Sequence, residues 1–280
     1  MSEKRTVSIV IRNRNEASML AKILPALAAQ EYEAKEIVLV DNESTDGSLA
    51  LADHFGARVV HLPKSQFSYG RAINRGIEAS TGDFILLLSA HSLPLGKDFI
   101  TKALAKFEDP KVAAVRCMLV SKTADLENWV EGGRLTWPVD FFSIVQHGPI
   151  ASGCVLRRSV WEKIPFDEQL EAVEDKMWAM DALRAGHVIE RSDAYYLHMR
   201  KRRLLESVQI MNRERLAVFR STGKLWPVPM PSLLRLAKTV LLSTPKAAFE
   251  MAAREILMYC YFKTIPLQAR RGARTGAIQD

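Results

Sequence analysis

Short apolar runs alternate with helical patterns over the first 120 residues of the chain. Runs rich in valine, isoleucine and leucine predict strands at residues 7–11, 37–40, 58–62, 84–88 and 112–120. Between them, apolar residues recur at helical spacing, which predicts helices near residues 19–27, 49–55, 69–79 and 97–107. Short, almost wholly apolar strands separated by helices are typical of a parallel sheet covered on both faces. The pattern therefore predicts an α/β fold with a Rossmann-type, mostly parallel sheet flanked by helices.

Polar residues follow three of these strands at the point where each strand ends. Residues 12–16 (RNRNE) follow the first strand, residues 41–46 (DNESTD) the second, and residues 89–92 (SAHS) the fourth. The carboxyl ends of parallel strands meet at one edge of a sheet, and ligands bind beyond that edge. A single Ser or Asn at such a position is as often a turn former or helix cap as a ligand-binding residue, but three polar clusters at one edge predict a binding site. No G-x-G-x-x-G follows the first strand and no P-loop motif occurs in the sequence, which excludes both phosphate cradles.

The pattern becomes less regular in the second half of the chain. Residues 121–148 are rich in aromatic residues, and we favour a substrate-facing insertion over a loop that only packs on the domain. Order returns with a predicted strand at 152–156, helices at 159–163 and 173–185, an edge strand at 187–190 and a basic amphipathic helix at 204–219. The Pro-rich stretch WPVPMP predicts a linker before two further helices and a basic tail. The predicted organisation is one domain over 1–222, with halves at about 1–120 and 121–222, and a helical extension over 223–280.

Composition narrows the class of protein. Hydrophobic residues make up 48% of the 280 residues and charged residues 25%, as in an ordinary globular protein. The net charge of +7 favours anionic partners but does not choose among nucleic acid, phosphorylated small molecules and an anionic membrane surface. Three widely spaced cysteines argue against a disulfide framework or a zinc knuckle. With no signal-peptide pattern and no uncharged stretch of about 18–20 residues, the expected location is the cytoplasm.

Glu174 and Asp175 form the sharpest local signal for chemistry. They open the predicted helix 173–185 in the sequence EDKMWA. Carboxylates at a helix N-terminus interact well with the helix dipole, and that alone explains the pair. A carboxylate held at a helix start beside the carboxyl edge of a sheet is also well placed to act as a general base. Spacing alone leaves both interpretations open.

Five blocks of sequence together resemble a family-2 inverting glycosyltransferase of the GT-A fold. They are VSIVIRNRNE, EIVLVDNESTDGS, FSYGRAINRGIEASTGDFILLLSAH, LRRSVWEKIPFD and EDKMWAMDALRAGH. The blocks follow the order of that family from Val7 to His198, and they most resemble its rhamnosyltransferase-like bacterial branch. The resemblance implies transfer of a hexose or deoxyhexose from a nucleotide-sugar donor to a saccharide or lipid-linked saccharide acceptor, in surface polysaccharide or glycan biosynthesis.

The resemblance also implies roles for individual residues. Positions that hold the nucleotide base and ribose in the family are occupied here by Arg12, Asn15, Asp41 and Asn42. Asp175 corresponds to the base that deprotonates the acceptor hydroxyl, with Glu174 supporting the site. One base and no enzyme nucleophile imply a single displacement, and hence inversion at the anomeric carbon.

The chain departs from the family at the D-x-D motif, which holds a divalent metal on the donor diphosphate. Ser89, Ala90 and His91 stand at its three positions, so neither carboxylate is present. We expect His91 to serve as a metal ligand and His198 as a second one, with Mn²⁺ favoured over Mg²⁺ because an imidazole is a softer ligand than a carboxylate. Each histidine is also compatible with a purely structural role. The basic run 200–203 either closes over the diphosphate or forms a solvated face.

Two other functions remain as alternatives. A nucleotidyltransferase acting on sugar phosphates would share the α/β layout, but it usually carries a Gly-rich loop after the first strand. A basic nucleic-acid-binding module fits the charge, yet the Lys and Arg residues are spread without a recognised motif, and we expect no nucleic acid partner. The apolar faces of the two C-terminal helices, near residues 233–241 and 249–260, predict packing on the main domain, a homodimer contact, or peripheral anchoring on anionic lipid at the inner face of the cell membrane.

Overall fold

A computed structural model of the chain describes residues 5–120, 134–200 and 204–223. The chain groups into two compact units, Met1–Leu170 with Glu174–Arg200, and Glu171–Val173 with Lys201–Asp280. Helix α9 (Leu204–Thr222) is the described helix of the second unit, and it matches the basic helix predicted at 204–219. The predicted linker, the two C-terminal helices and the basic tail lie outside the described residues. The division of the chain at residue 222 therefore stays a prediction.

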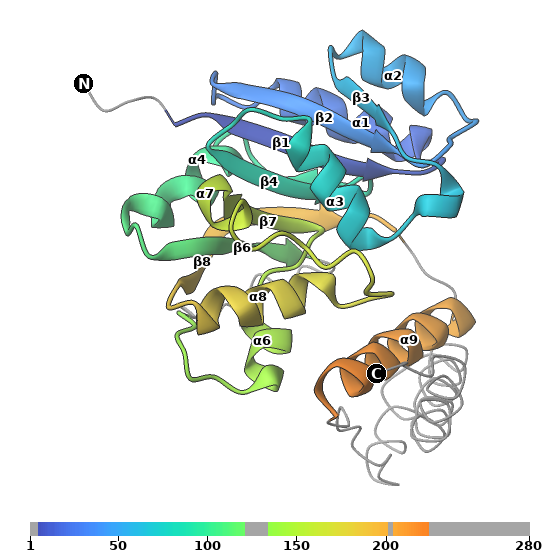
Figure 1. Ribbon diagram of the computed structural model, residues 1–280. Helices are drawn as coiled ribbons and strands as arrows, with labels where there is room; N and C mark the ends of the chain where they lie inside the picture. The colour runs from blue at the N-terminus through green and yellow to red at the C-terminus, as the bar shows by residue number, and fades with distance from the viewer. Residues whose placement is uncertain (1–4, 121–133, 201–203, 224–280) are drawn as a thin grey trace, which may run out of the picture. The chain divides into compact units, whose positions relative to one another are not determined.

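The first unit is built on a mixed, mostly parallel sheet whose strands run in the order β3-β2-β1-β4-β7-β6-β8-β5 (Figure 1). In chain order, the described strands are β1 (Val7–Asn13), β2 (Lys35–Asp41), β3 (Arg58–His61), β4 (Phe84–Ser89), β5 (Ser92–Pro94), β6 (Val112–Val120), β7 (Gly153–Arg157) and β8 (Val188–His198). Strands β1 to β4 run parallel to one another, and β8 runs parallel to β6. β7 is antiparallel to β4 and β6, and β5 is antiparallel to β8. The predicted fold class is confirmed, with antiparallel strands inserted in its second half.

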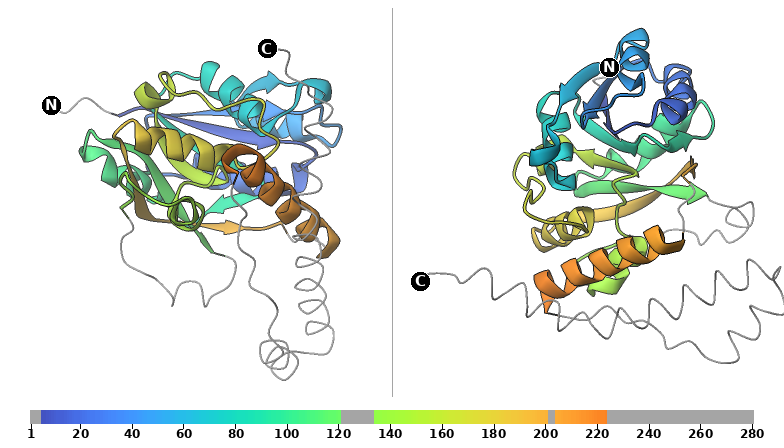
Figure 2. Two further views of the ribbon diagram at one scale, coloured as in Figure 1. Left: turned by 60° about the horizontal axis from the view of Figure 1, so that its bottom comes forward. Right: turned by 90° about the vertical axis from the view of Figure 1, so that its right-hand side faces the viewer.

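Helices flank both faces of this sheet (Figures 1 and 2). One face packs against α1 (Ala17–Ala28), α2 (Ser48–His54) and α4 (Phe99–Leu104). The other face packs against α3 (Tyr69–Glu78), α6 (Phe141–His147), α7 (Arg158–Trp161) and α8 (Glu174–Arg184). Two 3₁₀ turns, η1 (Lys64–Gln66) and η2 (Ala105–Glu108), complete the connections. Among the described helices, none combines the length and the apolarity that crossing a membrane requires.

Strand β1 shows why the strands are almost wholly apolar. Ile9 and Ile11 belong to the core on one face of the sheet, and Val10 belongs to the core on the other face. Successive side chains of a strand point to opposite faces, so a strand covered on both sides buries every residue. The sequence pattern that predicted a covered parallel sheet therefore has this direct physical cause.

The structure differs from the sequence prediction mainly after residue 90. The predicted edge strand 187–190 is wrong, because β8 continues to His198 and lies between β6 and β5 inside the sheet. Buried Ser192 and exposed Asp193 interrupt its apolar pattern and hide its length. No strand is predicted at β5, which has only three residues. In the described part of the predicted insertion, helix α6 forms and Leu135 pairs with β8.

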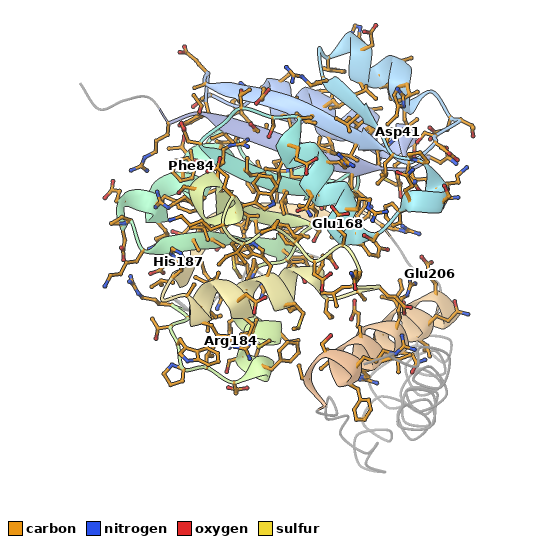
Figure 3. All side chains as sticks on the ribbon, in the orientation of Figure 1. Asp41, Phe84, Glu168, Arg184, His187 and Glu206 are labelled. Atoms are coloured by element: carbon orange, nitrogen blue, oxygen red, sulfur yellow. The ribbon has the colours of Figure 1, made fainter. Side chains whose placement is uncertain are left out.

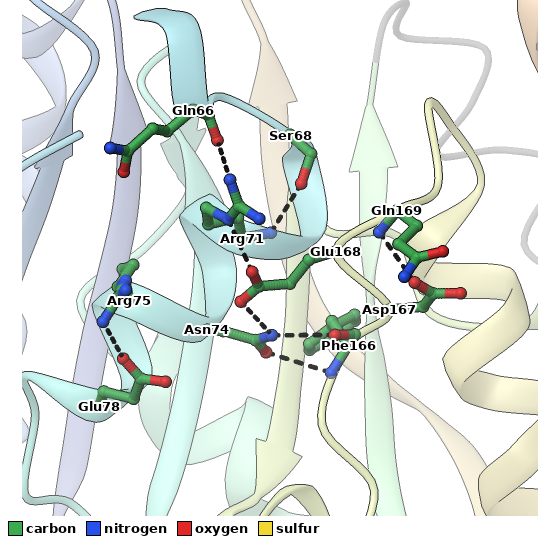
Figure 4. A network of polar contacts seen from close by, with 10 residues as sticks. All are labelled: Gln66, Ser68, Arg71, Asn74, Arg75, Glu78, Phe166, Asp167, Glu168 and Gln169. Carbon is green, nitrogen blue, oxygen red and sulfur yellow. Dashed lines mark hydrogen bonds and ion pairs between the residues drawn. The ribbon is translucent and has the colours of Figure 1, made fainter. Parts of the chain in front are cut away.

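A polar network holds residues 166–168 against α3 (Figure 4). The buried Asn74 side chain donates to Phe166 O at 2.9 Å and to Glu168 Oε1 at 3.1 Å, and it accepts from Phe166 N at 3.1 Å. Arg71 Nε pairs with the other oxygen of Glu168 at 2.6 Å. Because Asn74 uses both ends of its amide, residues 166–168 are fixed on α3.

Candidate active site

The carboxyl ends of β1 and β2 bring two of the polar clusters into direct contact. Figure 3 shows Asp41 at this edge of the sheet, with Phe84 and His187, at the starts of their strands, towards the opposite edge. Asn13 Nδ2 donates to Asp41 Oδ1 and to Ser44 Oγ, both at 3.0 Å. The convergence predicted for these loops is therefore confirmed.

Three of the predicted nucleotide-binding residues shape the loops at this edge. Asp41 is only 1% exposed, and its Oδ2 accepts from Ser44 N at 3.0 Å. Asn42 is also buried and donates to a backbone carbonyl that follows β3, at 2.9 Å. Asn15 has a φ of 52°, a conformation that Asn tolerates, and accepts from Thr45 N at 2.7 Å. The loops are firmly held, and contact of these residues with a nucleotide stays a prediction.

Arg12, the fourth of these residues, does not contact the loops that follow β1 and β2 in the described structure, and its side chain extends towards α8. Its Nη1 lies 3.4 Å from Glu174 Oε1, and its Nη2 donates to Ala151 O at 3.2 Å. The guanidinium also lies over the ring of Tyr69, 5.3 Å from the ring centre. Arg12 therefore connects the end of β1 to Glu174 and Asp175, called the acid pair below.

The acid pair lies in the first turn of α8, and its two carboxyls have different surroundings. Burial and the neighbouring Asp175 raise the pKa of Glu174 to about 7, against the opposing effect of Arg12. The Asp175 side chain is 15% exposed, with Oδ2 accepting from Ala151 N at 2.9 Å and lying 3.8 Å from Lys176 Nζ. Asp175 is thus the more accessible carboxyl of the pair, and it is held in place by the backbone.

His91 and His198 lie together, with ring centroids 4.5 Å apart and the rings at 68°. The pairing of β5 with β8 brings them there, because Ser92 is the register partner of His198 and Met199 N donates to His91 O at 2.9 Å. Glu16 Oε1 lies 3.7 Å from His91 Nδ1, and burial raises the pKa of Glu16. Two imidazoles and a carboxylate are donor types that suit a borderline divalent cation. Within the described residues, no group of three His, Cys, Asp or Glu side chains is already arranged as a metal site.

Ser89 and Ala90 precede His91 and are both buried. Ser89 is the register partner of Arg12 across β1 and β4, and Ala90 N donates to Arg12 O at 3.2 Å. These contacts place the third polar cluster beside the end of β1. A contact of Ser89 or Ala90 with a donor stays a prediction.

Two cations that were not predicted from the sequence hold the loop before β7. Arg116 Nη1 donates to the carbonyls of Gln146 and Gly148, and Lys176 Nζ donates to the carbonyl of Pro149. The same loop presents the amide that fixes Asp175. One signal in the sequence was available for Arg116, because it is the single charged residue in the apolar run VAAVRCMLV.

Solved structures share the fold of the chain. The chain has the GT-A fold of glycosyltransferases. It matches a mannosyltransferase from Pyrobaculum calidifontis, described in complex with GDP-Man and Mn²⁺, with a TM-score of 0.62 and 17% identity, over 96% of this chain and 88% of that one. The chain belongs to Glycosyl transferase family 2, which matches residues 8–163, more than half of its length. The predictions of fold family and of a glycosyltransferase are confirmed.

Two curated relatives match shorter parts of the chain. A PGL/p-HBAD biosynthesis glycosyltransferase of Mycobacterium bovis BCG is 39% identical over 88 residues, which are 30% of this chain and 34% of the relative. The O-antigen chain rhamnosyltransferase of Salmonella anatum is 25% identical over 91 residues, which are 32% of this chain and 29% of the relative. The chain thus spans about a third of the length of these relatives. The second relative agrees with the predicted resemblance to the rhamnosyltransferase-like branch.

Proposed function

We propose that the chain transfers a sugar from a nucleotide-sugar donor to a saccharide or lipid-linked saccharide acceptor, with inversion, in surface polysaccharide or glycan biosynthesis. One observation carries the proposal: the partly exposed Asp175 is fixed by Ala151 N at the start of α8, where a base is needed. The names of the relatives, which refer to PGL/p-HBAD biosynthesis and to the O-antigen chain, support the class of acceptor. The GDP-Man in the description of the solved mannosyltransferase supports the class of donor.

Asp175 is the general base of the proposed reaction. It takes the proton of an acceptor hydroxyl while that oxygen attacks the anomeric carbon of the donor sugar. The bond from that carbon to the diphosphate oxygen breaks in the same step, and the nucleoside diphosphate leaves with its electron pair. Attack from the face opposite the leaving group inverts the anomeric centre. Glu174, with its pKa raised to about 7, stays beside Asp175 as a group that is neutral in part of its population at neutral pH.

The nucleotide half of the donor occupies the carboxyl edge of β1, β2 and β4 in this proposal. The residues that hold its base and ribose are Arg12, Asn15, Asp41 and Asn42, and Ser89 and Ala90 lie at the diphosphate. The contacts between Asn13, Asp41 and Ser44 support the proposal, because they place these loops side by side.

His91 and His198 would hold a divalent cation at the same edge. When bound, the cation would neutralise charge on the leaving diphosphate. The Mn²⁺ in the solved mannosyltransferase and the proximity of the two imidazoles support this assignment, and the nitrogen donors favour Mn²⁺ over Mg²⁺. Glu16 lies close enough to His91 to orient its ring.

The proposal extends to the setting of the enzyme. We place it in the cytoplasm, as one catalytic domain over 1–222 with a helical extension over 223–280. The extension would contact the inner face of the cell membrane or a second copy of the chain, and a lipid-linked acceptor would make membrane contact useful. The family match favours glycosyl transfer over both nucleotidyl transfer and nucleic acid binding.

A donor screen tests the proposal directly. Thermal unfolding is measured with UDP-, GDP- and dTDP-sugars, with and without Mn²⁺. The correct donor stabilises the protein by about 2.7 kcal/mol at 100 times its Kd. Release of nucleoside diphosphate is then followed with saccharide acceptors. A protein that no nucleotide-sugar stabilises, or that instead releases pyrophosphate from a nucleoside triphosphate and a sugar 1-phosphate, would contradict the proposal.

A further inference from the structure

Strands β6 and β8 place two arginines side by side within the sheet. Arg116 on β6 and Arg191 on β8 are register partners in a parallel pair, so their side chains lie on the same face of the sheet. Two residues earlier in each strand, Ala114 and Ile189 belong to the core on the face that α8 covers (Figure 1). The two arginines therefore continue that face just beyond its apolar core.

Neither arginine forms an ion pair with a carboxylate in the part of the chain that the structure describes. The Nη1 of Arg116 donates to backbone carbonyls, and Arg191 Nη2 lies 3.5 Å from the sulfur of Met118. The Nε atoms of both arginines are buried and have no hydrogen-bond partner among the residues that the structure describes. Buried donors without acceptors cost free energy, and two neighbouring cations repel each other. Both arginines are only partly buried, so an anion that contacts the exposed part of each side chain would offset the repulsion between the two charges.

The charges of this pair reach a third group at the end of α6. Burial lowers the pKa of His147, and the fields of Arg191 and Arg116 lower it further. Burial also lowers the pKa of Arg116, with Arg191 adding to the effect. His147 stands between Gln146 and Gly148, whose carbonyls Arg116 holds. Arg116, Arg191 and His147 are therefore close enough for the charge of one to shift the pKa of another.

This region adjoins the proposed base. The loop that Arg116 holds at Gly148 continues to Ala151, whose amide donates to Asp175 Oδ2. Asp175 also interacts electrostatically with Arg116 itself. The two arginines lie on β6 and β8, whereas the residues proposed for the nucleotide follow β1, β2 and β4. They thus stand on the acceptor side of the sheet.

We propose that Arg116 and Arg191, with His147 beside them, bind a phosphate group of the acceptor substrate. The assignment rests on the proposed function, in which Asp175 is the base for an acceptor hydroxyl. A guanidinium presents parallel N–H donors that match phosphate oxygens, and two guanidiniums together balance its charge. The acceptor class that follows is a phosphorylated or lipid-phosphate-linked saccharide rather than a neutral one.

The test uses the full chain and inorganic phosphate as the probe. Wild-type protein is first saturated with the nucleoside diphosphate that the donor screen selects, so that the donor site is filled, and phosphate binding is then followed by ³¹P NMR titration. Arg191→Gln is the test variant, because within the described residues Arg191 donates to the sulfur of Met118 and to no backbone carbonyl. Its replacement should therefore leave the loop before β7 intact. We expect the Kd for phosphate to rise by about tenfold or more in Arg191→Gln and to recover partly in Arg191→Lys. The Kd for the nucleoside diphosphate should stay within about twofold of wild type.

The matched control is Arg75→Gln, which removes an exposed arginine on α3 and should leave phosphate binding unchanged. Phosphate binding that is absent with the donor site filled, or equal in wild type and Arg191→Gln, would overturn the inference. Loss of nucleoside diphosphate binding in Arg191→Gln would assign the pair to the donor and also overturn it, while the proposed function would stand. A wild-type chain that binds no nucleotide would instead remove the proposed function on which the inference rests.

Discussion

Arg12 and Glu174 are separated by 162 positions in the sequence, yet Arg12 Nη1 lies 3.4 Å from Glu174 Oε1. Their side chains are only 16% and 8% exposed, so water screens the pair weakly. The contact ties the end of β1, where the nucleotide is proposed to bind, to the first turn of α8, where the base is proposed. Arg12 thereby contacts both halves of the proposed site. Replacing Arg12 or Glu174 should therefore change the properties of the half that holds the other residue.

Replacing Asp175 by Asn should lower kcat by roughly 10²–10⁴ and leave donor binding nearly intact. The amide keeps the size of the side chain but cannot accept the proton of the hydroxyl. Steady-state turnover and nucleoside diphosphate affinity are measured on the same preparation. Asp181→Asn is the control, because it removes an exposed carboxylate from the same helix. Turnover of Asp175→Asn at the rate of wild type would remove Asp175 from the mechanism.

Replacing Glu174 by Gln should change how stability depends on pH. Burial and Asp175 raise the pKa of folded Glu174 from 4.5 to about 7, so the folded state binds more protons than the unfolded state between these values. The free energy of unfolding that this group contributes is therefore fully present below pH 4.5 and is lost as pH rises through about 7. Gln cannot titrate, so this part of the slope should disappear. Urea unfolding at several pH values measures it.

The control for this experiment is Glu78→Gln, an exposed carboxylate on α3 that should leave the slope as it is in wild type. The comparison between variants matters more than the absolute slope, because other carboxylates titrate over the same range in every variant. An unchanged slope in Glu174→Gln would show that Glu174 is ionised throughout this range in the folded protein.

Replacing Arg12 by Gln should destabilise the protein more at pH 8 than at pH 5. At pH 8 the variant leaves the buried Glu174 charge without its cation, at a cost of about 1–3 kcal/mol. At pH 5 Glu174 is protonated and needs the cation less. A double-mutant cycle with Glu174→Gln measures the coupling, which should be larger at pH 8. Equal coupling at both pH values would contradict the electrostatic origin of the contact.

The first half of the fold could be predicted because burial on both faces leaves a simple trace in the sequence. Strands such as β4 (FILLLS) are wholly buried, and a continuous apolar run is the direct result. β5 and the end of β8 could not be predicted in this way. β5 is too short to show a period, and β8 mixes buried, half-buried and exposed positions.

The candidate site likewise has residues that the sequence pattern predicts and residues that it does not. The polar loops and the acid pair were found because their residue types stand at strand ends and at a helix start. The contact of Arg12 with Glu174 could not be predicted, because the two residues are far apart in the sequence and only the fold brings them together. Arg116 and Arg191 were missed because an isolated arginine in a strand looks like an interruption of the pattern, and only the register of β6 and β8 shows that the two stand together.

Replacing His91 by Ala should raise the Mn²⁺ concentration needed for activity or abolish activity, because it removes one proposed ligand of the cation. His91→Asp should recover activity with Mg²⁺, since an oxygen ligand suits the harder ion. His187→Ala is the control, because His187 precedes β8 and lies towards the opposite edge of the sheet (Figure 3). Activity is measured against Mn²⁺ and Mg²⁺ concentration for all three variants. Loss of a metal ligand lowers the affinity for Mn²⁺, and this reduces activity most at limiting Mn²⁺. Full activity of His91→Ala at limiting Mn²⁺ would therefore show that His91 has only a structural role.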